Sequence, residues 1–298
     1  MKKIGLVLEG GGLRGIFTAG VLDFFLDKGI EFDYVVGVSA GACNLMGYVA
    51  KRRGYYRDVV LNDASEDPFF GIMQMADSHK FVDLDKAFDV YAEKEHYDYD
   101  KLLNSKTDWD LVVSNINTGL AEYKNEHIDL ERLKLIGKAS CSIPVLTSPI
   151  ELDGNVYLDG GICDSIPIKR AEEVGCDYTV VVATRRKGVY CHCSEIEKQA
   201  YSRLFSKKYP NFYRMLTNRQ EMYIDQITYA ENQEKNGKSF LIRPTLPETG
   251  RLEKDTSKLS LSYYHGYTKA EELYNDLAMF MNNAKKETIK DKITNIFK

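Results

Sequence analysis

Two short apolar segments, each followed by a glycine-rich turn and a helical pattern, fill the first 53 residues of this 298-residue chain. The first segment is Lys3–Leu8 and the second is Tyr34–Val36. Apolar residues recur at helical spacing over Ile16–Phe25 after the first turn, and Gly41–Arg53 reads as a helix after the second. A strand that passes through a crossover helix to a second strand builds a parallel sheet. The sequence therefore predicts an α/β fold with a mainly parallel central sheet.

This alternation of strands and helices continues to about residue 187. A hairpin is indicated by the turn residues Asp153-Gly154-Asn155, which separate two β-prone runs. Beyond residue 190 the sequence becomes mostly helical and rich in Tyr, Lys and Arg. We therefore expect an α/β domain at residues 1–187 and a mostly helical C-terminal extension at residues 188–298. The other expected elements are strands at Asp110–Ser114, Leu120–Tyr123 and Tyr178–Ala183 and helices at Asp129–Lys138 and Pro167–Val174.

The composition is that of a soluble globular protein. Hydrophobic residues make up 44% and charged residues 28% of the chain, which argues against disorder. The 40 Lys and Arg residues against 44 Asp and Glu leave a net charge of −4, so we expect no nucleic-acid partner. No apolar run approaches the ~20 residues of a spanning helix. The five residues Ile4–Leu8 are too few for a signal peptide, and we therefore expect a cytoplasmic protein.

Cysteine content bears on disulfides and metals. Six cysteines in 298 residues are too few for a disulfide scaffold, and we expect reduced thiols. Only Cys191-His192-Cys193 invites a metal-binding interpretation. Adjacent ligands cannot easily share one tetrahedral ion, and no second Cys/His pair follows at zinc-finger spacing. We expect neither a metal nor an organic cofactor.

The first glycine-rich turn, Gly10–Gly15 (GGGLRG), lies between a predicted strand and the start of a predicted helix. Glycine leaves the backbone N–H groups accessible there and the helix N-terminus adds positive potential, so the turn can bind an anion. Its glycines also match the dinucleotide-binding pattern G-x-G-x-x-G. That pattern needs an acidic residue at the end of the second strand, whereas Asp33 precedes this strand. The nucleotide-binding interpretation therefore lacks one of its elements.

The second turn, Gly37-Val38-Ser39-Ala40-Gly41, is a G-x-S-x-G sequence between strand and helix. In that context the pattern forms a strained elbow that holds the serine hydroxyl above the sheet, and Gly37 and Gly41 remove clashes at the sharp turn. The simpler role for Ser39 is an ordinary helix N-cap. The elbow context favours Ser39 as a nucleophile.

A serine nucleophile needs a base, because its hydroxyl alone is a poor nucleophile. In the chain order of an α/β-hydrolase, only His192 and His265 come late enough to be the triad histidine. His192 lies between two cysteines, and His265 lies near the start of a predicted helix, where capping or packing is the expected role. The other candidate is Asp159, in the sequence LDGG just past the predicted hairpin, where neighbouring N–H groups can hold a carboxylate.

With these residues the chain resembles the patatin-like phospholipases, which are lipid acyl hydrolases with a Ser-Asp dyad. Cys141 and Ser142 stand where small apolar residues are expected, a departure that bears on packing more than on chemistry. The resemblance rests on four motifs that occur in family order within about residues 1–185: Gly10–Gly15, Gly37–Gly41, Ala139–Pro144 and Asp159–Gly161.

The resemblance implies a three-layer α/β/α patatin-like fold and a serine acyl-ester hydrolase of the phospholipase A or lysophospholipase type. The implied substrate is a phospholipid or another acyl ester. In the implied mechanism Asp159 takes the proton from Ser39, which attacks the ester and forms an acyl-enzyme. Backbone N–H groups of the first turn bind the oxyanion, and the implied oxyanion residues are Gly10, Gly11, Gly12, Leu13 and Arg14.

Two other functions fit the same residues. One is a serine esterase of small soluble esters, which would act in the absence of any lipid aggregate. The other is a catalytically idle lipid-binding scaffold that kept the fold.

Charge is unevenly distributed along the chain. Asn62–Asp100 contains eleven Asp and Glu against three Lys, whereas Lys198–Arg219 contains six Lys and Arg and no acidic residue. Aromatic residues alternate with the cations of this basic stretch, which suits an anionic membrane surface, a single-stranded nucleic acid or docking onto the acidic segment. The sequence leaves these three partners open, and the oligomeric state as well. Lys285–Lys298 carries a weaker amphipathic pattern that is typical of a surface helix.

Overall fold

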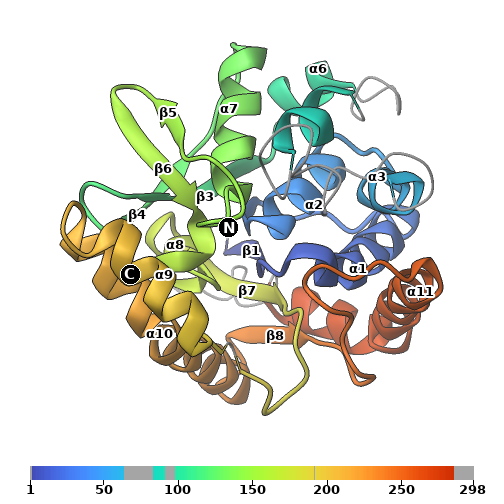
Figure 1. Ribbon diagram of the computed structural model, residues 1–298. Helices are drawn as coiled ribbons and strands as arrows, with labels where there is room; N and C mark the ends of the chain where they lie inside the picture. Colours follow the sequence, from blue (N-terminus) through green and yellow to red (C-terminus); the bar gives the residue numbers. More distant parts are fainter. Residues whose placement is uncertain (1, 64–82, 91–97, 191, 285–298) are drawn as a thin grey trace, which may run out of the picture.

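The computed structural model describes residues 2–63, 83–90, 98–190 and 192–284, arranged around one eight-stranded sheet (Figure 1). Its strands are β1 (Lys3–Leu8), β2 (Tyr34–Val38), β3 (Asp108–Asn115), β4 (Leu120–Lys124), β5 (Ile150–Leu152), β6 (Asn155–Asp159), β7 (Cys176–Val182) and β8 (Ser239–Ile242). They follow the order β5-β6-β3-β2-β1-β7-β8, and β4 also pairs with β3. The pairings among β1, β2, β3, β7 and β8 are parallel, whereas β4, β5 and β6 pair in antiparallel fashion. The mainly parallel α/β sheet predicted from the sequence is confirmed.

Helices cover both faces of this sheet. They are α1 (Gly15–Asp27), α2 (Ala40–Val49), α3 (Tyr55–Asp63), α6 (Tyr99–Leu103), α7 (Leu130–Cys141), α8 (Ile168–Glu173), α9 (Glu195–Phe205), α10 (Pro210–Lys235) and α11 (Thr256–Glu272), with short turns η1 (Gly12–Arg14), η2 (Lys86–Val90) and η3 (Gly160–Ile162). α1, α2 and α7 pack on one face, and α8 and α10 pack on the other. Alternate strand residues serve the two cores, since Leu6 and Leu8 of β1 face the first set of helices and Val7 faces the second. The three-layer α/β/α arrangement is confirmed.

The helices in these ranges are too short or too polar to span a membrane. Within the described part of the chain, none combines the length and the apolar character needed to cross a bilayer.

The C-terminal part of the chain completes the sheet as well as adding helices. β8 pairs with β7 from Thr179↔Ser239 to Val182↔Ile242. The sequence analysis missed this strand, because its four residues follow a long helical pattern and show no apolar alternation. One sheet therefore spans both sides of residue 187, and the division there stays a proposal.

α11 lies against α1 through a glycine on each helix. A Cβ atom on Gly20 would lie 2.0 Å from the Tyr263 carbonyl oxygen, and one on Gly266 would lie 2.0 Å from the Phe17 carbonyl oxygen. Only glycine allows two helix backbones to come this close. The Tyr263 hydroxyl also donates to the buried carboxylate of Asp23 at 2.7 Å. α11 is thereby bound to the first helix.

The basic aromatic stretch forms α9 and the first turns of α10. Three aromatic rings of this stretch are buried against β6 and η3, so these rings hold the two helices on the sheet and are not available to enter a membrane. The acidic segment Asn62–Asp100 lies largely outside the described residues, and Lys285–Lys298 lies wholly outside them. The rings buried in a cluster with residues of β6 and η3 are Tyr201, Phe205 and Phe212.

We expect Gly266→Ala to lower the free energy of unfolding by about 3 kcal/mol or more, because the added methyl group would collide with the Phe17 carbonyl. Helix propensity alone predicts the opposite sign, a gain of about 1 kcal/mol. Urea denaturation followed by circular dichroism measures the difference. The control is Gly250→Ala, where the nearest atom is 3.8 Å from an added Cβ. Equal stabilities of the two variants would contradict the packing argument.

Candidate active site

Ser39 lies in the sharp turn between β2 and α2. Its φ of 54° and ψ of −120° form a positive-φ conformation that costs a non-glycine residue about 1–3 kcal/mol. A Cβ on Gly37 would lie 2.5 Å from the Gly41 carbonyl oxygen, and a Cβ on Gly41 would lie 2.4 Å from the Leu8 carbonyl oxygen, so the turn requires both glycines. Ser39 occupies the N-cap position of α2, but its side chain makes no capping hydrogen bond. The geometry favours the nucleophile elbow over the capping role.

Asp159 reaches Ser39 because β2 and β6 meet end to end along one edge of β3. Val112 of β3 pairs with Val38 on this edge and with β4 on the other. The next residue, Val113, pairs with Asp159 and again with β4, so β6 continues along the edge where β2 ends. Ser39 follows the last residue of β2, and Asp159 is the last residue of β6. The Ser39 hydroxyl lies close enough to the Asp159 carboxyl group to lower its pKa.

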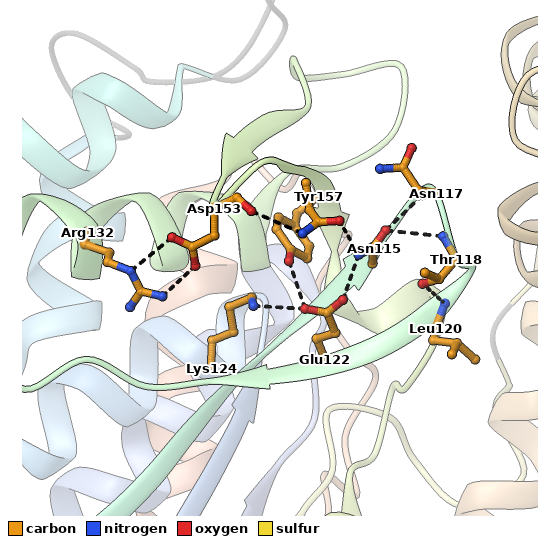
Figure 2. Close-up of polar contacts among 10 residues, drawn as sticks. Asn115, Asn117, Thr118, Leu120, Glu122, Lys124, Arg132, Asp153 and Tyr157 are labelled. Atoms are coloured by element: carbon orange, nitrogen blue, oxygen red, sulfur yellow. Dashed lines mark hydrogen bonds and ion pairs between the residues drawn. The ribbon is translucent and has the colours of Figure 1, made fainter.

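A polar network holds the strand that ends in this carboxylate (Figure 2). Glu122 of β4 accepts hydrogen bonds from Asn115 of β3 at 2.7 Å and from the Tyr157 hydroxyl of β6 at 2.8 Å. Arg132 of α7 pairs with Asp153, at the turn of the β5–β6 hairpin, at 2.7 Å. The hairpin is thereby tied to both β4 and α7.

The segment Ala139–Pro144 touches both partners of the Ser-Asp pair. The Ser140 hydroxyl accepts a hydrogen bond from the Ser39 amide at 3.0 Å, and the Ser142 carbonyl accepts one from the Asp159 amide at 2.7 Å. Ser140 and Ser142 are fully buried. The sequence analysis used this segment only as a motif of the family resemblance and missed both contacts, because each joins residues distant in the chain.

Asp159 is buried, and burial raises the pKa of its carboxyl group above the usual 3.8. Four interactions oppose this rise and favour the carboxylate: the charge of Arg219, the Ser39 hydroxyl, the Gly161 amide at 2.8 Å and the charge of Arg251. A carboxylate whose pKa is raised is a better proton acceptor. The sequence analysis placed Arg219 only in the basic stretch and did not single out Arg251.

A buried ion pair holds the residue that precedes the first glycine-rich turn. Glu9 is fully buried, pairs with Arg185 and accepts a hydrogen bond from the Thr184 amide at 2.6 Å. The chain then turns sharply at Gly12, whose φ is 57°. The turn lies in the wall of the same cavity as Ser39.

Backbone amides of this turn differ in what they can bind. The Leu13 amide donates to the Arg251 carbonyl at 3.0 Å, which removes Leu13 from the predicted oxyanion donors. The amides of Gly10, Gly11 and Gly12 have no acceptor among the residues that the structure describes. The Arg14 side chain lines the same cavity.

Two cavities meet at Ser39. One has an empty volume of about 830 Å³ and a largely apolar wall that includes Met46 and Phe88. The other, of about 530 Å³, is the more polar of the two and is lined by Asp159, Gly10–Gly12 and several arginines. A molecule held across Ser39 would therefore meet apolar surface in one cavity and cations in the other.

Neither histidine of the alternative triad belongs to the described residues that line these two cavities. His265 is hydrogen-bonded through Nε2 to the Thr245 hydroxyl at 3.0 Å, and His192 is exposed. Cys191 lies outside the described residues, and within them no three His, Cys, Asp or Glu side chains are grouped to hold a metal ion. Of the three candidate bases, Asp159 is the one that lines a cavity together with Ser39.

Comparison with protein families gives two matches. A family model described as "Patatin-like phospholipase" matches residues 6–172, and one described as "Domain of unknown function (DUF6363)" matches residues 209–282. Ser39 and Asp159 fall in the first region, whereas Arg219 and Arg251 fall in the second.

Individual relatives match about three fifths of the chain. The uncharacterized protein YjjU of Escherichia coli K12 is 34% identical over 197 residues, which are 63% of this chain and 54% of that protein. Lysophospholipase nte1 of Neurospora crassa is 28% identical over 196 residues, and that of Aspergillus terreus is 26% identical over 188; each match covers 61% of this chain. The matches span about half of YjjU and 12% of each lysophospholipase. The crystal structure of VipD from Legionella pneumophila aligns with 93% of this chain and 67% of its own, at a TM-score of 0.49 and 13% identity.

Proposed function

The chain belongs to the patatin-like phospholipase family, and from this membership we propose that it is a lipid acyl hydrolase of the phospholipase A or lysophospholipase type. One observation carries the proposal. The Ser39 hydroxyl, held in a strained elbow, lies beside the buried carboxyl group of Asp159, where an apolar cavity meets one lined by arginines. An acyl chain fits the first cavity and a polar headgroup fits the second.

In the proposed mechanism Asp159 removes the proton of Ser39, and the serine oxygen attacks the ester carbonyl. The alcohol leaves with a proton, and water then hydrolyses the acyl-enzyme with Asp159 as the base again. The Gly10–Gly12 amides receive the oxyanion, and each such donor typically lowers the barrier by about 3 kcal/mol. No step needs a metal or an organic cofactor.

A dyad of this kind predicts that Ser39→Ala and Asp159→Asn each remove ester hydrolysis almost completely, because groups that act as one unit are not additive. Ester turnover and labelling by a fluorophosphonate serine-hydrolase probe measure the losses. His265→Ala is the control and should keep activity. If the wild type is neither labelled nor active, the idle lipid-binding scaffold is the better interpretation.

Folding of the Asp159→Asn variant is checked by its thermal stability. A carboxyl group whose pKa is raised on folding stabilises the protein only at low pH, and this stabilisation is lost as pH rises through the raised pKa. The neutral amide avoids that loss. We therefore expect Asp159→Asn to melt at or above the wild-type temperature at neutral pH, so its inactivity would not reflect unfolding.

The pH dependence follows from the same burial. Because Asp159 must be ionised to act as a base and burial raises its pKa, kcat/KM for a soluble ester should fall on the acid side with a midpoint above 3.8. A midpoint at or below 3.8 would contradict the assignment of this buried carboxylate as the base.

We propose in addition that α9 and the turn after it contact an anionic membrane, which distinguishes a lipid hydrolase from an esterase of small soluble esters. Ile196 and Leu204 are 81% and 55% exposed on α9, and Arg203, Lys207 and Lys208 are exposed beside them. Apolar side chains flanked by cations suit a headgroup surface.

Charge reversal at Lys207 and Lys208 together should therefore lower co-sedimentation with phosphatidylserine vesicles about tenfold or more at low salt, since each cation near the surface contributes about 1 kcal/mol. Hydrolysis of a small soluble ester should not change. Lys235→Glu, at the far end of α10, is the control. Unchanged vesicle binding would reject the membrane contact and favour the soluble esterase.

A further inference from the structure

We propose that Arg219 and Arg251 bind the phosphate of the substrate and thereby select phospholipids over neutral acyl esters. The inference rests on the proposed hydrolase function and specifies its substrate class. Arg219 lies on α10, and Arg251 lies in the loop before α11. Both belong to the C-terminal part of the chain, which this role connects to the chemistry at Ser39.

Cations outnumber carboxylates in the wall of the polar cavity. Four arginines line it, against the single carboxylate of Asp159. Arg185 is neutralised, because it pairs with the buried Glu9. The other arginines that line the cavity are Arg14, Arg219 and Arg251.

Arg219 is held in place without being neutralised. Its Nε donates to the Gly161 carbonyl at 2.7 Å, and the Gly161 amide in turn donates to Asp159. The guanidinium group is therefore fixed beside the catalytic pair by a neutral acceptor. Its charge acts on Asp159 and lowers the pKa of that carboxyl group, against the larger effect of burial.

Arg251 is fixed through its backbone, since its carbonyl accepts the Leu13 amide. Neither Arg251 nor Arg219 forms an ion pair within the described part of the chain. Glu197 of α9 is close enough for both charges to act on it, but its carboxylate accepts hydrogen bonds from the Ser194 amide and hydroxyl, each at 2.8 Å. Two half-buried cations thus face the cavity with no carboxylate of their own.

An anionic ligand would neutralise the charge of such a pair of cations. Unpaired charge away from water is unfavourable, and guanidinium groups bind phosphate oxygens with two parallel hydrogen bonds. The phosphate of a glycerophospholipid lies only a few bonds from its ester. With the acyl chain in the apolar cavity and the ester at Ser39, the phosphate would reach the arginine cavity, because the two cavities share Ser39.

A second explanation for both arginines is that they only keep Asp159 ionised. Under that explanation their loss would slow all esters equally and move the acid limb of the pH profile to higher pH. If the arginines bind phosphate, their replacement lowers activity only on substrates that carry a phosphate group. The two explanations therefore differ in a ratio of activities.

The test compares 1-palmitoyl-glycerol with 1-palmitoyl-glycerol 3-phosphate, which differ only in the phosphate. We expect Arg219→Gln and Arg251→Gln each to lower the ratio of kcat/KM for the phosphorylated over the neutral ester about tenfold or more, the usual effect of losing a charged hydrogen bond. Arg214→Gln, an exposed arginine on the same helix, is the matched control and should leave the ratio unchanged. An equal loss on both esters, or no change in the ratio, would overturn the proposal.

A binding measurement separates this inference from the proposed activity. The ether analogues of the two lipids cannot be hydrolysed, and their Kd for Ser39→Ala protein is measured by calorimetry. The phosphorylated ether should bind at least about tenfold more weakly when Arg219→Gln is added, while the neutral ether keeps its Kd. Competition of the phosphorylated ether with inorganic phosphate would support the shared phosphate site. If binding shows no preference for phosphate, the inference fails even where hydrolysis succeeds.

Discussion

The candidate site depends on one constraint in the sheet, namely that a single edge of β3 is shared by two strands that end against each other. β2 pairs with Asp108–Val112, and β6 takes over at Val113. The chain leaves this point through the elbow after β2 and through η3 after β6. Gly160 permits the second departure, since a Cβ there would lie 2.1 Å from the Val112 carbonyl oxygen. A shift of either pairing by one residue would separate Ser39 from Asp159.

The C-terminal part of the chain contacts the elements that form this site. β8 extends the sheet beside β7, and the glycine contact between α1 and α11 lies close to the first glycine-rich turn. The Arg251 carbonyl binds the Leu13 amide, and the Arg219 side chain binds the Gly161 carbonyl. The first contact is made to the glycine-rich turn and the second to η3, and residues of both line the cavity beside Ser39. The C-terminal part of the chain therefore shapes the cavity beside Ser39 that Arg219 and Arg251 line.

Burial and charge act in opposite directions on Asp159. Loss of water favours the neutral acid, whereas the arginine charges and the hydrogen bonds favour the carboxylate. The positive φ of Ser39 is a strained conformation and also destabilises the folded protein. Fully buried β2 and the bond from the Ser39 amide to Ser140 hold the elbow in this conformation. The surrounding packing thus maintains a site that would not be stable as an isolated loop.

Local patterns in the sequence were enough to predict the parallel sheet, the elbow at Ser39 and the carboxylate after the hairpin. Each depends on glycine spacing or apolar periodicity over a few residues, which backbone sterics impose wherever the chain lies. Tertiary structure alone decided that β8 joins the sheet, that the Leu13 amide is occupied and that Arg219 lines the same cavity as Asp159. An arginine on a helix has the same sequence pattern whether it faces water or a cavity. These features arise from contacts between residues far apart in the chain, and such contacts leave no local periodicity.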